Sequence, residues 1–288
     1  MLISEALELA TDKFSAAGVL SPSVDAELLG CFILEIDRSE LTLLAISNQS
    51  FPENKLPEFL EAVQRREKRE PLQHITGSAP FRHLELEVGP GVFIPRPETE
   101  QLVELAMEKI QKVSSPLIVD LCSGSGAIAI SLSTELESAT VYAVELSKEA
   151  FEYLTSNFQK YGLDTKTIRN ENLTTALDEL EGKVDLVVSN PPYIPDAAVP
   201  IDLEVKLHDP SIALYGGEDG LDVIREISTR ALYLLRHGGH LVLEHANTQA
   251  PAIGELLLSQ GWQEIVSSQD LTGKNRMISA VRPERQRQ

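Results

Sequence analysis

The chain has 288 residues, of which 42% are hydrophobic and 24% are charged, so it can form two domains or one large α/β domain with an addition. Its net charge of −19 at pH 7 disfavours tight, sequence-independent binding to a phosphate backbone, which needs clustered Lys and Arg. No apolar run approaches the length of a bilayer span, and the first residues lack the basic start and cleavage site of a secretory signal. Composition therefore predicts a cytoplasmic protein that contacts neither a membrane nor nucleic acid directly.

The two cysteines, Cys31 and Cys122, are far apart in the sequence and have no close-spaced partner. Neither a disulfide framework nor a zinc cluster is expected from this spacing. An acidic surface would suit a basic protein partner, although solubility is the simpler explanation of the charge.

The first part of the chain, to about residue 70, has the apolar spacing of helices. We expect a first helix that ends at Gly18 and a second that begins with Ser21 as N-cap and Pro22 in its first turn. A third helix follows Ser39, and a fourth runs from about Leu56 to Pro71. These helices predict a small N-terminal helical domain, over residues 1–77.

Residues 84–88 alternate between apolar and polar, and the Gly-Pro-Gly of residues 89–91 then leads into Val-Phe-Ile-Pro. This pattern predicts a β-hairpin that links two domains, over residues 78–95. A helix with acidic residues in its first turn follows, within PRPETEQLVELAMEKIQ, and opens the second domain, over residues 96–288.

Beyond residue 115, strands alternate with helices, which indicates βαβ units and a parallel sheet with both faces covered. The last two strands have no helix between them, so they are expected to form an antiparallel pair at one edge. The fold class predicted is therefore α/β. The strands expected lie within residues 116–121, 139–146, 166–172, 184–190, 238–245, 262–268 and 276–282.

Ligands of such sheets bind beyond the carboxyl ends of the strands, so the residues that follow each strand carry most information. After the first strand comes DLCSGSGAIAI, in which Gly124, Gly126 and Ala129 satisfy the G-x-G-x-x-A form of a nucleotide-binding fingerprint. This motif alone leaves three possibilities open: a structural tight turn, an NAD site or another nucleotide site.

Glu145 ends the second strand about 20 residues later, where a carboxylate can accept hydrogen bonds from ribose hydroxyls. Such an acid serves NAD and S-adenosylmethionine alike, and an ordinary exposed strand-end glutamate is the alternative. Glu171 and Asn172 follow the third strand and could meet the amino edge of an adenine, although lone residues of these types are more often turn formers.

The sequence NPPY, at residues 190–193, follows the fourth strand and decides between these cofactors. Pro191 and Pro192 fix the backbone, so that the Asn190 side-chain oxygen and the Pro191 carbonyl can accept both protons of a planar NH₂ group. Tyr193 supplies a ring against which a flat amide or base can pack. Two fixed oxygens would stabilise the positive charge that grows on nitrogen when a methyl group arrives from a sulfonium.

No strong base, catalytic triad or paired carboxylates are needed for this chemistry, and we expect no metal. His237, His240 and His245 lie in turns or at a strand end and lack the further partners that a metal site requires.

With these residues in hand, the chain resembles the bacterial protein-(glutamine-N5) methyltransferases that modify peptide-chain release factors. The resemblance covers nearly the whole length and is carried by an ordered set of motifs: PLQHITG, FRHLELEV, FIPRPETE, DLCSGSGAIAI, AVELS, VVSNPPYIP, GGEDGLDVIREI and GGHLVLEH. It implies a seven-stranded, Rossmann-like methyltransferase domain, S-adenosylmethionine as cofactor with S-adenosylhomocysteine as product, and a helical domain for recognition of the substrate protein. The methyl acceptor implied is the glutamine of a Gly-Gly-Gln loop, in translation termination.

The resemblance also assigns site residues. The residues implied to bind the cofactor are Cys122, Ser123, Gly124, Ser125, Gly126, Glu145, Glu171, Asn172 and Asn190, and those implied to bind the acceptor amide are Asn190, Pro191, Pro192 and Tyr193. One departure is visible, because the family usually has glycine where Cys122 stands. A monomer is expected.

Several rival functions share part of this pattern. The nearest is methylation of a glutamine in a ribosomal protein. Amino-methylating DNA enzymes bind a similar NH₂ group with NPPY, but they must also flip a base and bind phosphates. The negative net charge of this chain disfavours phosphate binding. A binding scaffold without turnover would have no use for Asn190, and an NAD dehydrogenase would need a proton donor that the sequence does not offer.

Overall fold

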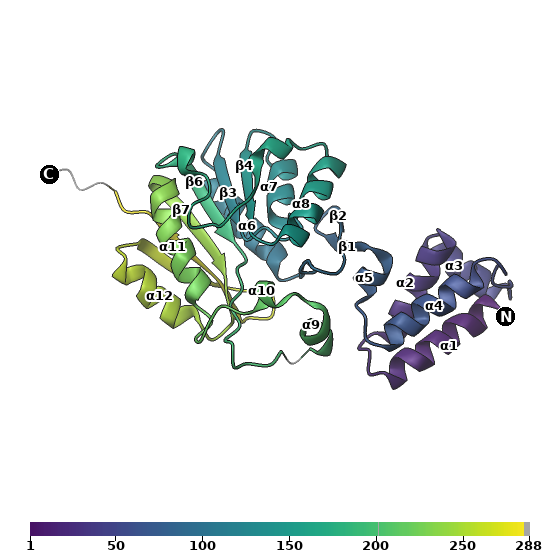
Figure 1. Cartoon of the computed structure of the whole chain (residues 1–288). Coiled ribbons are helices and arrows are strands. Elements are labelled where there is room, and N and C mark those ends of the chain that lie inside the picture. The colour runs from purple at the N-terminus through teal and green to yellow at the C-terminus, as the bar shows by residue number, and fades with distance from the viewer. Residues whose placement is uncertain (201, 285–288) are drawn as a thin grey trace. The chain divides into compact units, whose positions relative to one another are not determined.

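The computed structural model describes residues 1–200 and 202–284. The chain divides into two compact units, of which the first contains Met1–Ser78 with Pro200–His208 and the second contains Ala79–Val199 with Asp209–Gln288. Each unit has its own hydrophobic core, and the elements of both are labelled in Figure 1.

The first unit is helical, as the apolar spacing predicted. Its helices are α1 (Ile3–Ala16), α2 (Pro22–Leu34), α3 (Arg38–Ile46), α4 (Leu56–Glu67), α5 (Leu72–Thr76) and α9 (Leu203–His208). Phe14, Leu29 and Phe59 are fully buried at the centre of its core. The short helices α5 and α9 were not expected, because five or six residues carry too little periodicity to identify a helix.

Local signals explain most helix ends in this unit. Gly18 adopts a left-handed φ of 74° just after α1, and the side chain of Asp37 accepts a hydrogen bond from the Glu40 N–H (2.8 Å) at the start of α3. Ser21 does occupy the N-cap position before Pro22, but its side chain makes no capping hydrogen bond.

The second unit begins with a two-stranded sheet of β1 (Ser78–Phe81) and β2 (Leu84–Glu87). The hairpin therefore turns at Arg82 and His83, and the Gly-Pro-Gly expected to form its turn lies after it instead. Left-handed backbone at Arg82 (φ 53°) allows this tight connection.

The main sheet has seven strands in the order β5-β4-β3-β6-β7-β9-β8. The first five of these pair in parallel, whereas β9 runs antiparallel to both β7 and β8. This confirms the predicted α/β class and the antiparallel edge pair. The strands are β3 (Leu117–Leu121), β4 (Thr140–Glu145), β5 (Ile168–Asn170), β6 (Val184–Ser189), β7 (Leu235–Glu244), β8 (Gln263–Gln269) and β9 (Asn275–Val281).

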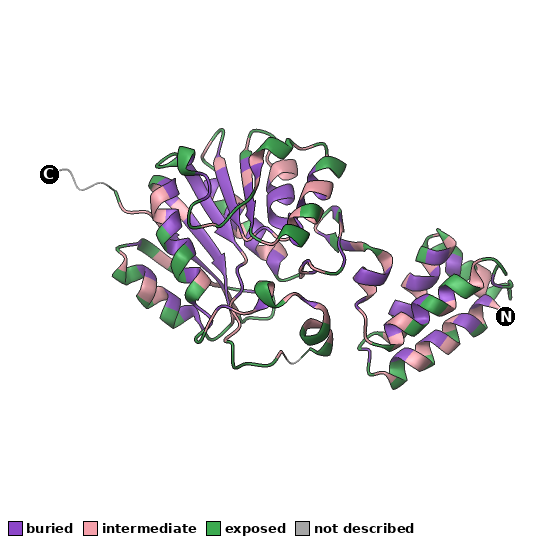
Figure 2. Cartoon of the chain, viewed as in Figure 1, coloured by how far each residue is buried: buried purple, intermediate pink, exposed green. Residues whose placement is uncertain are grey.

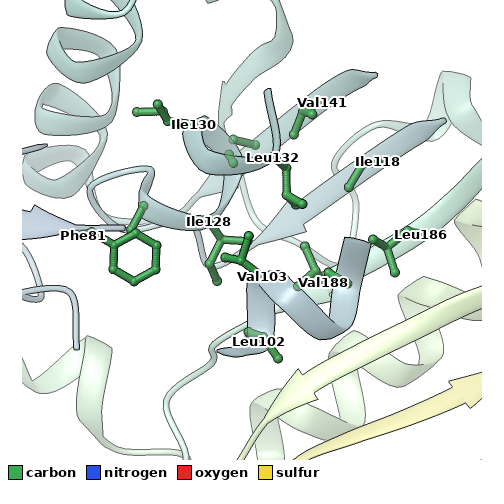
Figure 3. Close-up of a cluster of buried hydrophobic side chains, with 14 of the residues drawn as sticks. Phe81, Leu102, Val103, Ile118, Ile128, Ile130, Leu132, Val141, Leu186 and Val188 are labelled. Atoms are coloured by element: carbon green, nitrogen blue, oxygen red, sulfur yellow. The ribbon is translucent and has the colours of Figure 1, made fainter. Parts of the chain in front are cut away.

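Helices cover both faces of this sheet, and its central strands are buried (Figure 2), whereas the edge strand β8 is largely exposed. Alternate residues of β6 belong to different core clusters: Leu186 and Val188 pack with residues of α6, α7 and α8, whereas Val187 packs with residues of α11 and α12. Figure 3 shows the first cluster. The covering helices are α6 (Thr99–Ile110), α7 (Ala127–Glu135), α8 (Lys148–Lys160), α11 (Asp222–Leu234) and α12 (Ala250–Ser259).

Candidate active site

The strand order reverses between β3 and β6. From β3 the chain continues to β4 and β5 on one side, and β6 and β7 lie on the other. Leu121 pairs with Ser189, and Ser189 pairs with Leu243, so the ends of β3, β6 and β7 stand in register. The loops that follow these strands therefore meet at a topological switch point, where open α/β sheets bind ligands.

The glycine-rich loop between β3 and α7 uses left-handed backbone at Cys122 (φ 62°), Gly124 (φ 55°) and Gly126 (φ 91°). The φ of Gly126 lies in the left-handed region, and a Cβ there would also come within 2.8 Å of the Cδ1 of Leu154, so glycine is favoured. Cys122 adopts a conformation that favours glycine, and this is the position at which the family usually has glycine.

The two serines of the loop hold its shape. Ser123 donates its backbone N–H to the Val144 carbonyl (3.1 Å) and its hydroxyl to the Asp120 carbonyl (3.0 Å). The carbonyl of Ser125 accepts from Nδ2 of Asn157 on α8 (3.0 Å). The loop is thus tied to β4 on one side and to α8 on the other.

Glu145 lies at the end of β4 and is buried. Its Oε2 accepts from the Gly124 N–H (2.8 Å), and its Oε1 accepts from the Ser147 N–H (2.7 Å). Burial raises the pKa of this carboxyl, while the backbone donors at Ser147 and Gly124 lower it. The structure therefore brings Glu145 onto the glycine-rich loop.

Glu171 and Asn172 are both exposed after β5. The Glu171 N–H donates to the Glu145 carbonyl (3.2 Å). The Oδ1 of Asn172 accepts from the N–H and the hydroxyl of Thr174 (2.9 and 2.7 Å), so this side chain forms a turn.

Asn190 follows β6 and is half-buried, while Pro191 and Pro192 are buried behind it. Its Nδ2 donates to Oγ1 of Thr99 (3.0 Å), and the Thr99 hydroxyl donates to Oε2 of Glu244 at the end of β7 (2.7 Å). The Tyr193 hydroxyl donates to Oε1 of the same glutamate (3.3 Å). Sequence reasoning missed Thr99 and Glu244, although Glu244 ends a parallel strand and so met the rule applied to the other site residues.

A second loop fixes the backbone of the NPPY segment. The Ile194 N–H donates to the Leu214 carbonyl (2.8 Å), and the Gly216 N–H donates back to the Ile194 carbonyl (2.9 Å). Gly216 and Gly220 allow this close approach, since a Cβ at these positions would lie 2.7 Å from the Pro192 oxygen and 2.3 Å from the Tyr193 oxygen respectively. Gly216 and Gly220 of GGEDG are therefore required by the NPPY backbone.

Two carboxyl groups near the strand ends are buried. Burial raises the pKa of Asp120 to about 8 and that of Glu244 to about 7. Among the described residues, neither carboxylate oxygen of Asp120 makes a well-formed hydrogen bond, although the Ser123 hydroxyl and the Ala129 N–H favour its ionised form, whereas Glu244 accepts from two hydroxyls. In residues 1–200 and 202–284 no cluster of His, Cys, Asp or Glu could hold a metal ion, and no helix could cross a membrane.

Comparison with known proteins matches both parts of the chain. Residues 5–77 match the family model described as the PrmC N-terminal domain, and residues 84–209 match the methyltransferase small domain. The release factor glutamine methyltransferase of Streptomyces coelicolor is 44% identical over 97% of this chain and 98% of its own length. The protein of the same name from Deinococcus radiodurans is 38% identical over 98% of this chain and 99% of its own length. The chain belongs to the release factor glutamine methyltransferase family.

This membership confirms the resemblance found in the sequence motifs. Among solved structures, a methyltransferase from Pyrococcus furiosus covers 70% of this chain and 91% of its own length, with a TM-score of 0.51 and 16% identity. At this identity the likeness shows the fold alone, a Rossmann-like methyltransferase domain.

Proposed function

We propose that this protein transfers a methyl group from S-adenosylmethionine to the side-chain amide nitrogen of the glutamine in the Gly-Gly-Gln loop of peptide-chain release factors. The family membership supports this substrate class. The observation that carries the proposal is the Asn190 amide, whose Nδ2 donates to the Thr99 hydroxyl, so that Oδ1 is the end of the amide left to accept from a substrate. Asn190 follows β6, which pairs with β3, the strand that leads into the glycine-rich loop.

The residues at the end of β3 and β4 suit the cofactor. Gly124 has no atom within 4 Å of the place a Cβ would occupy, which leaves room for close approach of a ligand to the backbone, and the buried carboxylate of Glu145 stands where ribose hydroxyls would donate. We assign Cys122–Gly126 to the methionine part, Glu145 to the ribose, and Glu171 with Asn172 to the adenine. When bound, S-adenosylmethionine supplies an electrophilic methyl carbon on a sulfonium.

In this proposal Asn190 Oδ1 and the Pro191 carbonyl accept the two N–H protons of the substrate amide. The nitrogen would then be held in one orientation by this chain's own oxygens. With the cofactor bound, the two oxygens would stabilise the positive charge that grows on nitrogen as it takes the methyl group and S-adenosylhomocysteine leaves, which would contribute a few kcal/mol. The methylated amide then loses one proton to water. Pro192 stiffens the segment, and Tyr193 packs against the amide.

We further propose that residues 1–77 recognise the release factor, that residues 78–95 link this part to the catalytic residues 96–288, and that the enzyme acts as a cytoplasmic monomer. The match of residues 5–77 to the PrmC N-terminal domain supports the role of the helical part.

Labelled S-adenosylmethionine offered with unmodified release factor, ribosomal protein or DNA tests the proposal. Label is expected on one glutamine of the release factor only. Asn190→Ala should lower kcat about 10²–10³-fold, because one of two preorganised acceptors is lost. Cofactor binding and thermal unfolding of the variant should be measured to show that it is folded. Labelled DNA or ribosomal protein, or full transfer by Asn190→Ala, would overturn the assignment.

A further inference from the structure

Glu244 is connected to both functional side chains of the NPPY segment. It is 2% exposed at the end of β7 and accepts two hydroxyl protons, one from Thr99 and one from Tyr193. Thr99, at the start of α6, is 4% exposed and in turn receives Nδ2 of Asn190. A continuous hydrogen-bonded chain therefore runs from Glu244 through Thr99 to the Asn190 amide.

The chemistry of these groups fixes the direction in which the hydrogen bonds donate, from Asn190 through Thr99 to Glu244. An ionised carboxylate can only accept hydrogen bonds, and a threonine hydroxyl has a single proton to donate. Because Thr99 donates that proton to Glu244, it can only accept from Asn190. The amide must then turn its NH₂ group to Thr99 and its oxygen the other way, and this is the orientation needed to accept a proton from a substrate amide.

We propose that Glu244 is a positioning residue whose carboxylate, acting through Thr99, determines which end of the Asn190 amide faces the substrate. Through its second oxygen it also places the ring of Tyr193. This inference rests on the proposed function and deepens it, since it adds a residue that touches neither substrate nor cofactor.

Protonation of Glu244 reverses the direction of donation along this series of hydrogen bonds. A neutral carboxyl can donate a proton to the Thr99 hydroxyl oxygen. The threonine proton is then free for Asn190, so the amide can turn its oxygen toward Thr99 and away from the substrate. Burial raises the pKa of Glu244 to about 7, so this change in protonation falls near neutral pH. The groups that face Glu244 are Thr99, Tyr193, Arg276 on β9, which favours the ionised form, and Glu98, which opposes it.

The adjacent His245 does not supply a competing charge near neutral pH. Burial lowers its pKa below the ordinary value, and its Nδ1 lies 2.8 Å from the Ala246 carbonyl. Activity is therefore expected to rise with pH as Glu244 loses its proton.

The test measures kcat from pH 5.5 to 9 at saturating release factor and S-adenosylmethionine. For the wild type we expect an acid limb with a midpoint near 7. Glu244→Gln cannot ionise, so it should lose this limb, and its kcat should lie about tenfold below the wild-type plateau because one amide oxygen cannot serve two hydroxyls. The variant should melt no lower than the wild type at pH 8, since a neutral group replaces a buried charge.

Thr99→Val and Thr99→Ser provide the matched pair. Valine has nearly the same shape but no hydroxyl, and it should lower kcat about 10²-fold without changing the affinity for S-adenosylmethionine, whereas serine should restore most of the activity. Wild-type kcat in Thr99→Val, or an acid limb unchanged in Glu244→Gln, would overturn the inference. Absence of transfer to release factor by the wild type at pH 8 would instead contradict the proposed function.

Discussion

At the scale of single residues, the buried carboxyl groups are the unusual feature of this molecule. Asp120 is fully buried on β3, and the donors nearest its carboxylate, the Ser123 hydroxyl and the Ala129 N–H, do not offset the effect of burial on its pKa. An ionised carboxylate in such a place costs free energy, so the folded state holds the proton to a higher pH than the unfolded chain does. Asp120 was not identified from sequence, because an aspartate inside the apolar run LIVDL carries no local sign of its burial.

The consequence is a measurable dependence of stability on pH. The pKa of Asp120 is raised from 3.8 to about 8, so the folded state binds more protons than the unfolded state between these values. Stability should therefore fall as pH rises through this window, by up to about 1.4 kcal/mol per pH unit from this group, and level off above pH 8. Thermal unfolding of the cofactor-free protein from pH 5 to 9 measures the effect.

Asp120→Asn should flatten this decline up to about pH 8, because the amide does not titrate. Glu244→Gln should flatten it only below about pH 7, where the Glu244 carboxyl titrates in the folded state. Equal slopes in the wild type and Asp120→Asn would show that Asp120 is ionised in the folded protein.

At the scale of secondary-structure elements, the strands and the antiparallel edge pair could be predicted from the sequence, since β-branched apolar runs alternate with helical periods from β3 onward. The loops after β3, β4 and β6 followed from the rule on strand ends. Elements stabilised by distant residues could not be predicted in this way. The partner of Asn190 is Thr99, 91 positions away, and that of Thr99 is Glu244, 145 positions away.

The loop of residues 216–220 allows a sharp test of such a distant contact. In Gly216→Ala the new Cβ would lie 2.7 Å from the Pro192 oxygen and 2.8 Å from the Gly220 oxygen, both backbone atoms that cannot rotate away. The NPPY backbone must shift, so we expect kcat to fall about 10²-fold and stability by about 1–3 kcal/mol.

Gly254→Ala is the matched control for this variant. Gly254 lies inside α12, and no atom lies within 4 Å of the place that a Cβ would occupy there. Alanine should stabilise the helix by up to about 1 kcal/mol and leave kcat unchanged. If Gly216→Ala kept wild-type kcat, the NPPY segment would have to tolerate displacement of its backbone.

At the scale of the whole molecule, the long connection after the NPPY segment belongs to two units. Its Pro200–His208 segment clusters with the helical unit, whereas the residues before and after it cluster with the second unit. Charged side chains hold this segment in the helical unit. Arg66 binds Asp25 (2.7 Å) and Glu204 of α9 (2.8 Å), and Arg69 also binds Glu204 (2.9 Å).

The arginines in this cluster are largely buried, with side-chain exposures of 5% for Arg66 and 15% for Arg69. Removal of one partner from a buried ion pair leaves an uncompensated charge and costs about 3–5 kcal/mol. Arg66→Met removes the cation that pairs with Asp25, while Glu204 keeps Arg69, so it should destabilise the helical unit by about this amount in urea unfolding followed by circular dichroism.

Glu204→Ala should behave differently, because Arg66 keeps Asp25, and Arg69 keeps the carbonyls of Ala17 and Gly18 (3.2 and 2.9 Å). We expect a smaller loss of helical stability than in Arg66→Met, but faster proteolytic cleavage within residues 202–208, mapped by mass spectrometry. Lys206→Ala is the control, since it lies on α9 outside the cluster. Equal cleavage rates in the wild type and both of these variants would mean that apolar packing, rather than the ion pairs, holds α9. Faster cleavage in Glu204→Ala alone would show that two arginines of the helical unit fix the far end of the loop that carries Asn190.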